Sequence, residues 1–122
     1  MALRMKISVI IPCFNEEKTI TDLVGRVLKS LINMNKQIVI VDDCSTDNTF
    51  NILEGLSDVD KSIIIKSHSS NQGKGAAIRT ALLSVSGDIV IIQDADLEYN
   101  PEEYPKLLKP ILDGDADVVY GS

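Results

Sequence analysis

The sequence has few basic residues for its length, and the shortage is concentrated in its last third. Its 122 residues include 12 Lys and Arg against 18 Asp and Glu, which gives a formal net charge of −6. Residues 1–79 contain 10 basic and 9 acidic side chains, whereas residues 80–122 contain 2 basic and 9 acidic ones. A domain that binds nucleic acid needs a basic face for the phosphates. The acidic balance therefore argues against nucleic acid as a partner.

Cysteines and long apolar runs are also scarce. Cys13 and Cys44 have no CxxC partner, so we expect neither a disulfide framework nor a zinc site but two small apolar side chains in a reducing cytoplasm. No stretch reaches the ~18 apolar residues of a membrane span. The first apolar run follows Arg4 and Lys6 but ends at Pro12, too early for a signal peptide. The chain as it stands is expected to be cytoplasmic.

The sequence does contain a series of short β-branched runs separated by helical segments. The runs are apolar without alternation, which is typical of strands buried on both faces of a parallel sheet. They cover residues 7–11, 38–41, 63–65, 89–92 and 118–120. Apolar residues at helical spacing predict helices at 20–31 and 77–85, and a shorter, weaker helix is expected at 49–56.

This order of elements predicts an α/β fold with a Rossmann-like, doubly wound, mostly parallel sheet and helices on both faces. The length fits one domain, residues 1–122. A further helical segment is expected after Asn100, where Pro101 suits the first helical position and Pro105 and Pro110 would kink the helix. Ligands of such sheets bind beyond the carboxyl ends of the strands. Polar clusters follow four of the apolar runs, at residues 12–16, 42–43, 69–75 and 94–96.

Two carboxylates, Asp94 and Asp96, follow the fourth apolar run, and Glu98 lies two residues further on. In an extended turn this spacing lets the side chains face one hard cation. Mg²⁺ and Mn²⁺ prefer oxygen ligands and bridge them to phosphate oxygens. Such a pattern is often only a set of solvated acids in a turn. Its position after a buried strand favours a metal site here.

Two further clusters favour contacts with a nucleotide. Asp42 ends the second apolar run, where its carboxylate can accept a hydrogen bond from a base N–H or a ribose hydroxyl, whereas residues 45–49 are expected mainly to cap the next helix. Gly73 would let the backbone approach a ligand, and a helix N-terminus beside Lys74 favours a phosphate. His68 is expected to lie in a loop rather than to act as a catalyst.

The motifs of other nucleotide-dependent enzymes are missing. No GxGxxG follows the first apolar run, which argues against a nicotinamide-binding domain. Residues 73–75 lack the leading glycine and the Ser or Thr of a P-loop. A phosphatase with Asp94 as nucleophile is excluded, because Glu98 stands where such a motif has Thr or Val.

Four segments in order carry a resemblance to a known family: residues 9–17, 41–47, 71–75 and 93–101. Together they resemble family 2 glycosyltransferases of the GT-A fold. The last segment, with residues 117–122, is similar to the branch of dolichyl-phosphate mannose and glucose synthases. In place of the family's frequent Thr-Tyr the chain has Cys13 and Phe14, which keep the aromatic ring but lose a hydroxyl.

The resemblance implies a nucleotide-sugar site and a divalent metal site. Nucleotide-sugar contacts are expected from Pro12, Phe14, Asn15, Glu16, Asp42, Gly73, Lys74, Asp94, Ala95 and Asp96. Metal contacts, to Mg²⁺ or Mn²⁺, are expected from Asp94, Asp96 and Glu98. A cation between these acids and a diphosphate would let an acidic protein bind an acidic substrate.

The activity implied by the resemblance is that of a metal-dependent, inverting hexosyltransferase. The donor would be a UDP- or GDP-sugar, and a polyprenyl or dolichyl phosphate at the cytoplasmic face of a membrane would be a fitting acceptor. Family members continue well past residue 122 into the acceptor site, so the catalytic base is expected outside this chain and the chain alone is expected to be inactive. Its exposed edge could support a homo-oligomer. The alternative is a non-catalytic nucleotide-binding or assembly module.

Overall fold

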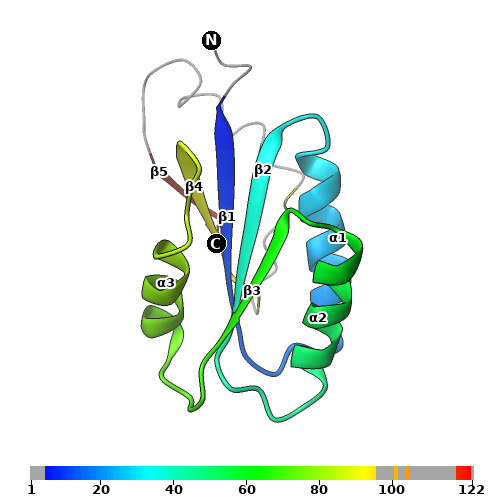
Figure 1. Ribbon diagram of the computed structural model, residues 1–122, viewed down its shortest axis with the longest axis vertical. Coiled ribbons are helices and arrows are strands. Elements are labelled where there is room, and N and C mark those ends of the chain that lie inside the picture. Colours follow the sequence, from blue (N-terminus) through cyan, green and yellow to red (C-terminus); the bar gives the residue numbers. More distant parts are fainter. Residues whose placement is uncertain (1–4, 96–100, 102–103, 105–117, 122) are drawn as a thin grey trace.

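The computed structural model describes residues 5–95, Pro101, Tyr104 and the backbone of residues 118–121, and all structural statements below concern these residues. Five strands and three helices follow one another along the chain (Figure 1). The strands are β1 (Lys6–Cys13), β2 (Asn35–Asp42), β3 (Ile63–Ser67), β4 (Ile89–Gln93) and β5 (Val118–Gly121). The helices are α1 (Ile20–Ser30), α2 (Thr49–Val59) and α3 (Lys74–Leu82).

The strands form one parallel sheet in the order β3-β2-β1-β4-β5. The chain first runs outward from β1 to β3 and then returns to the other side of β1 with β4. The strand order thus reverses between β1 and β4, and open sheets of this kind bind ligands beyond the carboxyl ends of the strands at such a point. The predicted doubly wound parallel sheet is confirmed.

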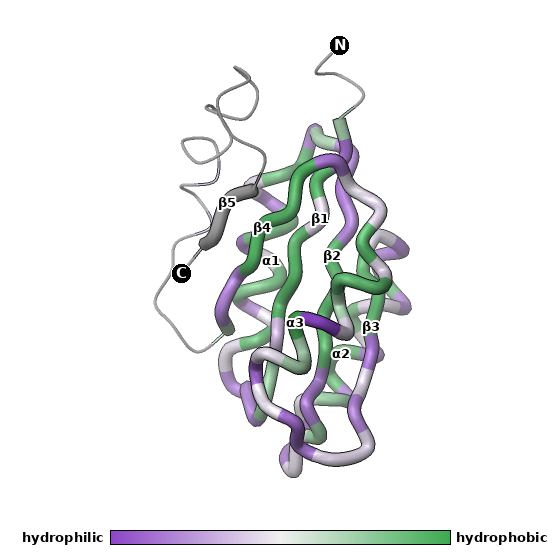
Figure 2. Tube along the Cα trace, turned by 90° about the vertical axis from the view of Figure 1, so that its left-hand side faces the viewer, coloured by the Kyte–Doolittle hydropathy of each residue, from purple (hydrophilic) through white to green (hydrophobic). Residues whose placement is uncertain are grey.

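The helices cover both faces of the sheet, with α1 and α2 on one side and α3 on the other (Figure 1). The larger core packs the apolar face of α1, including Leu23, Val24 and Val27, against alternate residues of β1 and β2. The smaller core packs Ala77 and Ala81 of α3 against the opposite face of the same strands. Figure 2 shows the middle of β1, β2 and β4 as hydrophobic, which is what burial on both faces requires.

Several elements extend beyond the apolar pattern that predicted them. β2 begins at Asn35, because its polar first residues still pair with Lys6 and Ser8 of β1 through the backbone. α2 has 11 residues, the same number as α1, so the prediction of a shorter second helix is wrong. α3 begins directly after Gly73 and ends earlier than predicted.

The helical segment expected after Asn100 lies outside the described residues, apart from two buried side chains, Pro101 and Tyr104. The hydroxyl of Tyr104 donates a hydrogen bond to Oε1 of Gln93 at 2.6 Å. In the part of the chain that the structure describes, no helix is both long enough and apolar enough to cross a bilayer.

Candidate functional site

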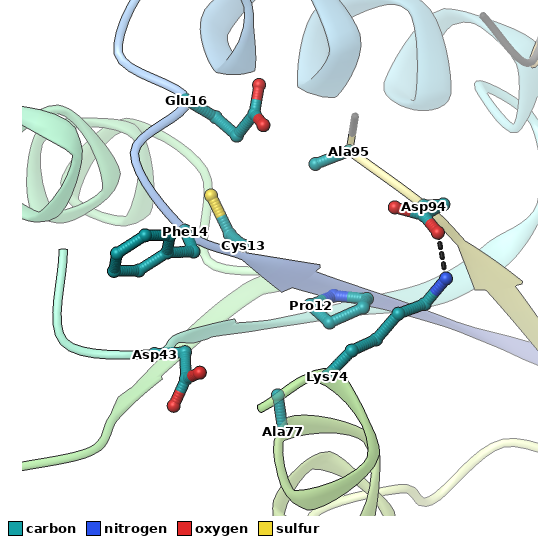
Figure 3. Close-up of a pocket in the computed structure, with 9 residues that line it drawn as sticks. All are labelled: Pro12, Cys13, Phe14, Glu16, Asp43, Lys74, Ala77, Asp94 and Ala95. Atoms are coloured by element: carbon teal, nitrogen blue, oxygen red, sulfur yellow. Dashed lines mark hydrogen bonds and ion pairs between the residues drawn. The ribbon is translucent and has the colours of Figure 1, made fainter. Parts of the chain in front are cut away.

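A pocket lies at the carboxyl ends of β1 and β4, where the strand order reverses (Figure 3). The residues that line it come from the end of β1 and the loop after it, from the ends of β2 and β4, and from the first turn of α3. They are Pro12, Cys13, Phe14, Glu16, Asp43, Lys74, Ala77, Asp94 and Ala95. Segments far apart in the sequence therefore meet where the fold predicts a ligand.

The pocket brings together most of the residues that the sequence predicted for nucleotide-sugar binding. Pro12, Phe14, Glu16, Lys74, Asp94 and Ala95 all line it. Asn15, Asp42 and Gly73 lie beside it rather than on its wall, and Asp96 and Glu98 lie outside the described residues. Sequence reasoning missed Cys13, Asp43 and Ala77, which share the wall. Of these three, only Asp43 could have been identified from the sequence, because it is an acid directly after the predicted Asp42.

Lys74 forms an ion pair with Asp94 across the pocket. Lys74 is the first residue of α3, and Figure 3 shows its side chain extending past Pro12 to the Asp94 carboxylate at the end of β4. Asp94 is 6% exposed, whereas the Lys74 side chain is half exposed. A buried carboxylate needs a compensating positive charge, and Lys74 provides one. The wall of the pocket thus holds a hard oxygen donor that attracts a cation.

The other predicted metal ligands cannot be located, since Asp96 and Glu98 lie outside the described residues. Among the residues that the structure does describe, no group of three His, Cys, Asp or Glu side chains is close enough to hold a metal ion. Asp94 is therefore the described member of the predicted metal site. Its carboxylate suits Mg²⁺ or Mn²⁺, which prefer oxygen ligands.

The neighbouring acids Asp42 and Asp43 have different surroundings. The Asp42 carboxylate accepts hydrogen bonds from the backbone N–H of Ser45, at 3.3 Å, and from the Ser45 hydroxyl. Asp42 is thus held against its own loop and is absent from the pocket wall. Asp43 lines the pocket. The sequence pointed to Asp42 as the nucleotide contact, whereas the structure leaves Asp43 nearer to the cavity.

Asp43 also binds the loop that leads into α3. Its Oδ1 accepts hydrogen bonds from the Gln72 N–H and the His68 ring, and its Oδ2 accepts one from the Gly73 N–H, each at 2.8 Å. Burial raises the pKa of the Asp43 carboxyl, but these hydrogen bonds outweigh that effect and hold the pKa below its usual value. The backbone N–H of Gly73, where the sequence predicted an approach to a ligand, therefore already binds Asp43.

The loop after β1 is tied to the loop after β2. Asn15 has a φ of 52°, a left-handed conformation that Asn tolerates better than most residues. Its backbone N–H donates to the Ser45 hydroxyl at 2.9 Å, and its Oδ1 accepts from the Thr46 N–H at 2.8 Å. The N–H of Glu16 donates to the Thr49 hydroxyl at 2.9 Å. These bonds fix the backbone that carries Phe14 and Glu16 into the pocket.

Residues 45–49 were expected mainly to cap α2, and only part of the segment does so. Oδ1 of Asp47 accepts a hydrogen bond from the Thr49 N–H at 2.9 Å, at the start of α2. Ser45 and Thr46 instead bind Asn15. Polar side chains of this kind serve equally well as caps and as loop ties, and only the folded chain distinguishes the two.

The two cysteines are free thiols, as the sequence predicted. Cys13 is 3% exposed, and burial, together with the nearby acids Asp42 and Glu16, raises the pKa of its thiol to about 12. The thiol therefore stays protonated at neutral pH and forms an apolar part of the pocket wall. The Cys44 thiol donates to the carbonyl of Ser69 at 3.6 Å.

Comparison with known proteins identifies the family. The sequence profile of glycosyl transferase family 2 matches residues 8–122. The chain belongs to glycosyl transferase family 2. Over 118 residues it is 36% identical to the dolichol-phosphate mannosyltransferase of Pyrococcus furiosus, covering 97% of this chain and 33% of that protein. The predicted resemblance to this family is confirmed.

Solved structures of similar proteins support the same family 2 fold. S. aureus TarS in complex with UDP-GlcNAc matches with a TM-score of 0.73 and 33% identity, over 90% of this chain and 32% of that one. The mannosyltransferase PcManGT from Pyrobaculum calidifontis, in complex with GDP-Man and Mn²⁺, matches with a TM-score of 0.71 and 26% identity, over 82% of this chain and 30% of that one. The family 2 chain thus spans about a third of the length of these relatives.

Proposed function

We propose that residues 1–122 form the nucleotide-sugar-binding part of an inverting, metal-dependent glycosyltransferase that uses a UDP- or GDP-sugar. The observation that carries this proposal is the pocket at the strand-order reversal, in which a cationic side chain, Lys74, and two buried carboxylates, Asp43 and Asp94, face one cavity. Family membership narrows the ligand to a nucleotide-sugar. The complexes of TarS with UDP-GlcNAc and of PcManGT with GDP-Man support both donor classes.

Within the pocket, the nucleoside would lie against Pro12 and Phe14. The Phe14 ring is 43% exposed, so one face is free to stack on a base or a ribose. Glu16 and Asp43 offer carboxylate oxygens to base N–H groups or ribose hydroxyls. Lys74 would bind the diphosphate, since its ammonium group is the charge on the pocket wall that attracts phosphate. Asn15, Asp42 and Gly73 would act through the loops that they hold.

Asp94, Asp96 and Glu98 would hold a divalent cation, Mg²⁺ or Mn²⁺. The Asp94 carboxylate fits this role, because it lies on the pocket wall and already attracts a positive group. When bound, such an ion stabilises the charge that develops on a leaving diphosphate. The Lys74 ammonium is then free to bind a phosphate oxygen rather than Asp94.

The acceptor that we propose is a polyprenyl phosphate at the cytoplasmic face of a membrane. The name of the Pyrococcus furiosus relative, dolichol-phosphate mannosyltransferase, supports this class. A phosphate oxygen is already anionic, so it needs little help from a general base. Because this chain covers about a third of such relatives, we expect it to bind the donor without transferring the sugar.

Calorimetry with UDP and with GDP, each with and without Mn²⁺, tests the proposal. Asp96→Ala should weaken Mn²⁺-dependent nucleotide binding at least about tenfold, because it removes one oxygen ligand of the cation. The matched control is Asp58→Ala, which removes an exposed acid from α2 and should leave the affinity unchanged. Equal affinity of Asp96→Ala and the wild type in the presence of Mn²⁺ would refute the metal assignment. A turnover assay on the same samples should detect no sugar transfer, and transfer by these 122 residues alone would contradict the proposal that they only bind the donor.

A further inference from the structure

His68 is the one histidine of the sequence, and its side chain is only 7% exposed. It follows β3, and both nitrogens of its ring have partners. Nδ1 lies 2.8 Å from Oδ1 of Asp43, and Nε2 lies 2.8 Å from the Thr80 hydroxyl. An ionised carboxylate only accepts hydrogen bonds. Nδ1 therefore carries the hydrogen and donates a hydrogen bond to Asp43. Neither contact was expected from the sequence, in which Asp43 lies 25 residues before His68.

A carboxylate, an imidazole and a hydroxyl in series are also the groups that activate a nucleophilic Ser or Thr. Thr80, however, lies within α3 and is not among the residues that line the pocket. A nucleophile must reach its substrate, so the series does not serve nucleophilic catalysis here. The function of His68 must instead be sought at the other end of the series, in Asp43.

Asp43 holds the two residues that lead into α3. Gly73, the residue that precedes the helix, has no side chain, and its φ of 96° is one that glycine adopts readily. The carboxylate of Asp43 reaches this helix end from the β2–α2 loop and accepts hydrogen bonds from Gln72 and Gly73. The next residue is Lys74. The direction in which the Lys74 side chain leaves the backbone is therefore set by the carboxylate that His68 orients.

The other contacts of this loop are the hydrogen bonds from the Cys44 thiol to the Ser69 carbonyl, at 3.6 Å, and from the Asn71 side chain to the Asp43 carbonyl, at 3.4 Å. Residues 69–72 are all exposed, so apolar packing contributes little to their position. Without the His68 donor, the Asp43 carboxylate keeps the N–H groups of Gln72 and Gly73 but loses the side-chain hydrogen bond that fixes it to a residue outside this pair. Residues 72 and 73 would then be held less firmly, and with them the backbone from which the Lys74 side chain leaves.

We propose that His68 is a positioning residue for phosphate binding: through Asp43 it fixes residues 72 and 73, so that Lys74, the residue that follows, points into the pocket. This inference rests on the proposed function, because it takes the diphosphate of a nucleotide as the ligand of Lys74. His68 is not itself among the residues that line the pocket, and it acts through Asp43, which is. Replacing His68 should therefore change the affinity for a nucleotide and the order of the loop before α3.

Two substitutions of similar polarity test the contributions of the two ring nitrogens of His68 separately. His68→Asn keeps an N–H donor near the position of Nδ1, toward Asp43, whereas His68→Gln keeps one near Nε2, toward Thr80. We expect His68→Asn to bind UDP or GDP within about threefold of the wild type and His68→Gln to bind about tenfold more weakly, because only the first orients Asp43. Calorimetry with UDP, GDP and Mn²⁺ measures both variants.

A structural readout accompanies the affinities. Amide hydrogen exchange at Gln72 and Gly73 should accelerate in His68→Gln and stay near the wild-type rate in His68→Asn. The control is Ser62→Ala, which removes a hydrogen bond to Asp60 at the opposite end of β3. It should lower stability without changing either the affinity or the exchange at these two amides.

The result that overturns the inference is equal affinity and equal exchange in His68→Gln and His68→Asn, or the reverse order of the two. If the wild type binds neither UDP nor GDP, the proposed function fails, and the exchange rates at Gln72 and Gly73 still decide whether His68 fixes the loop. A positioning role is also contradicted if Ser62→Ala binds the nucleotide as weakly as His68→Gln does. Nucleotide affinity would then depend only on the stability of the fold.

Discussion

Two buried polar networks lie at opposite ends of the same sheet. At the amino end, the Ser8 hydroxyl donates to Oε1 of Gln37 at 2.7 Å and accepts from the N–H of Gly87 at 2.9 Å. Oε1 of Gln37 also accepts from the Ser86 N–H, and its Nε2 donates to the Ser84 carbonyl at 2.8 Å. At the carboxyl end, Asp43 binds His68 and the loop before α3.

The two networks differ in charge and in what lies beside them. The amino-end network consists of hydroxyl, amide and backbone groups, which pair with one another, and none of its side chains is among those that line the pocket. The carboxyl-end network contains an ionised acid on the pocket wall. Buried polar side chains alone therefore do not indicate a site. A charged group that is both held by hydrogen bonds and open to a cavity is the better indication.

The largest effect on the free energy of unfolding is expected at Gly87, where the amino-end network leaves no space for a side chain. A Cβ on Gly87 would lie 2.5 Å from the Ser8 hydroxyl oxygen and 2.9 Å from the carbonyl oxygen of Lys6. Gly87→Ala should therefore lower the free energy of unfolding by about 3 kcal/mol, as overpacking of a rigid region does. Denaturant titration measures the change. The matched control is Gly55→Ala in α2, where a Cβ meets nothing within 4 Å and should stabilise by about 0.5–1 kcal/mol. Equal effects of the two variants would contradict the prediction.

The next effect comes from opening the same network. Ser8→Ala removes the acceptor of the Gly87 N–H and one donor to Gln37, and leaves a buried N–H without its partner. We expect a loss of about 2 kcal/mol in the free energy of unfolding. Nucleotide affinity of the folded protein should not change, because the carboxyl-end network is intact. A stability loss below about 0.5 kcal/mol would mean that water or a shifted Gln37 replaces the hydroxyl.

The smallest expected effect is on the pH dependence of the free energy of unfolding, in which the two networks should differ. The folded-state pKa of Asp43 is lowered, so its contribution to stability is complete above the unfolded-state pKa of about 3.9 and disappears as the pH falls through the folded-state value. Asp43→Asn should flatten the loss of stability below about pH 4. Ser8→Ala should leave that slope as in the wild type, since its network contains no ionised side chain. Urea unfolding at a series of pH values measures both slopes, and parallel curves for wild type and Asp43→Asn would refute the assignment.

The sequence predicted the sheet, its parallel order and the edge at which the pocket lies, because each strand of the pocket edge is an apolar run followed by polar residues. It did not resolve which of two adjacent acids faces the pocket. Side chains on a strand alternate between its two faces. If the predicted end of the strand is moved by one residue, the acid that faces the pocket changes from Asp42 to Asp43. The pattern of residue types is the same in either case.

The remaining differences concern contacts between loops. Asn15 was predicted to bind the nucleotide-sugar, yet its side chain binds Thr46, which is 31 residues further along. His68 lies in a loop, as predicted, but its contact with Asp43 was not predicted. Polar residues that hold a site and those that line it have the same composition and occupy the same segments. Only the three-dimensional arrangement separates the two groups.

The place of β1 in the sheet has a consequence for how the chain is made. β1 lies between β2 and β4, and the backbone N–H of Lys6 donates to Asp88, which is 82 residues further along. Ribosomes add about 5–20 residues per second, so one edge of this apolar strand remains unpaired for several seconds after its neighbour β2 is available. Pairings of such large sequence separation also form slowly. β1 is thus paired on its second edge only after β4 has been synthesised, and until then the nascent chain exposes an apolar strand edge to other chains.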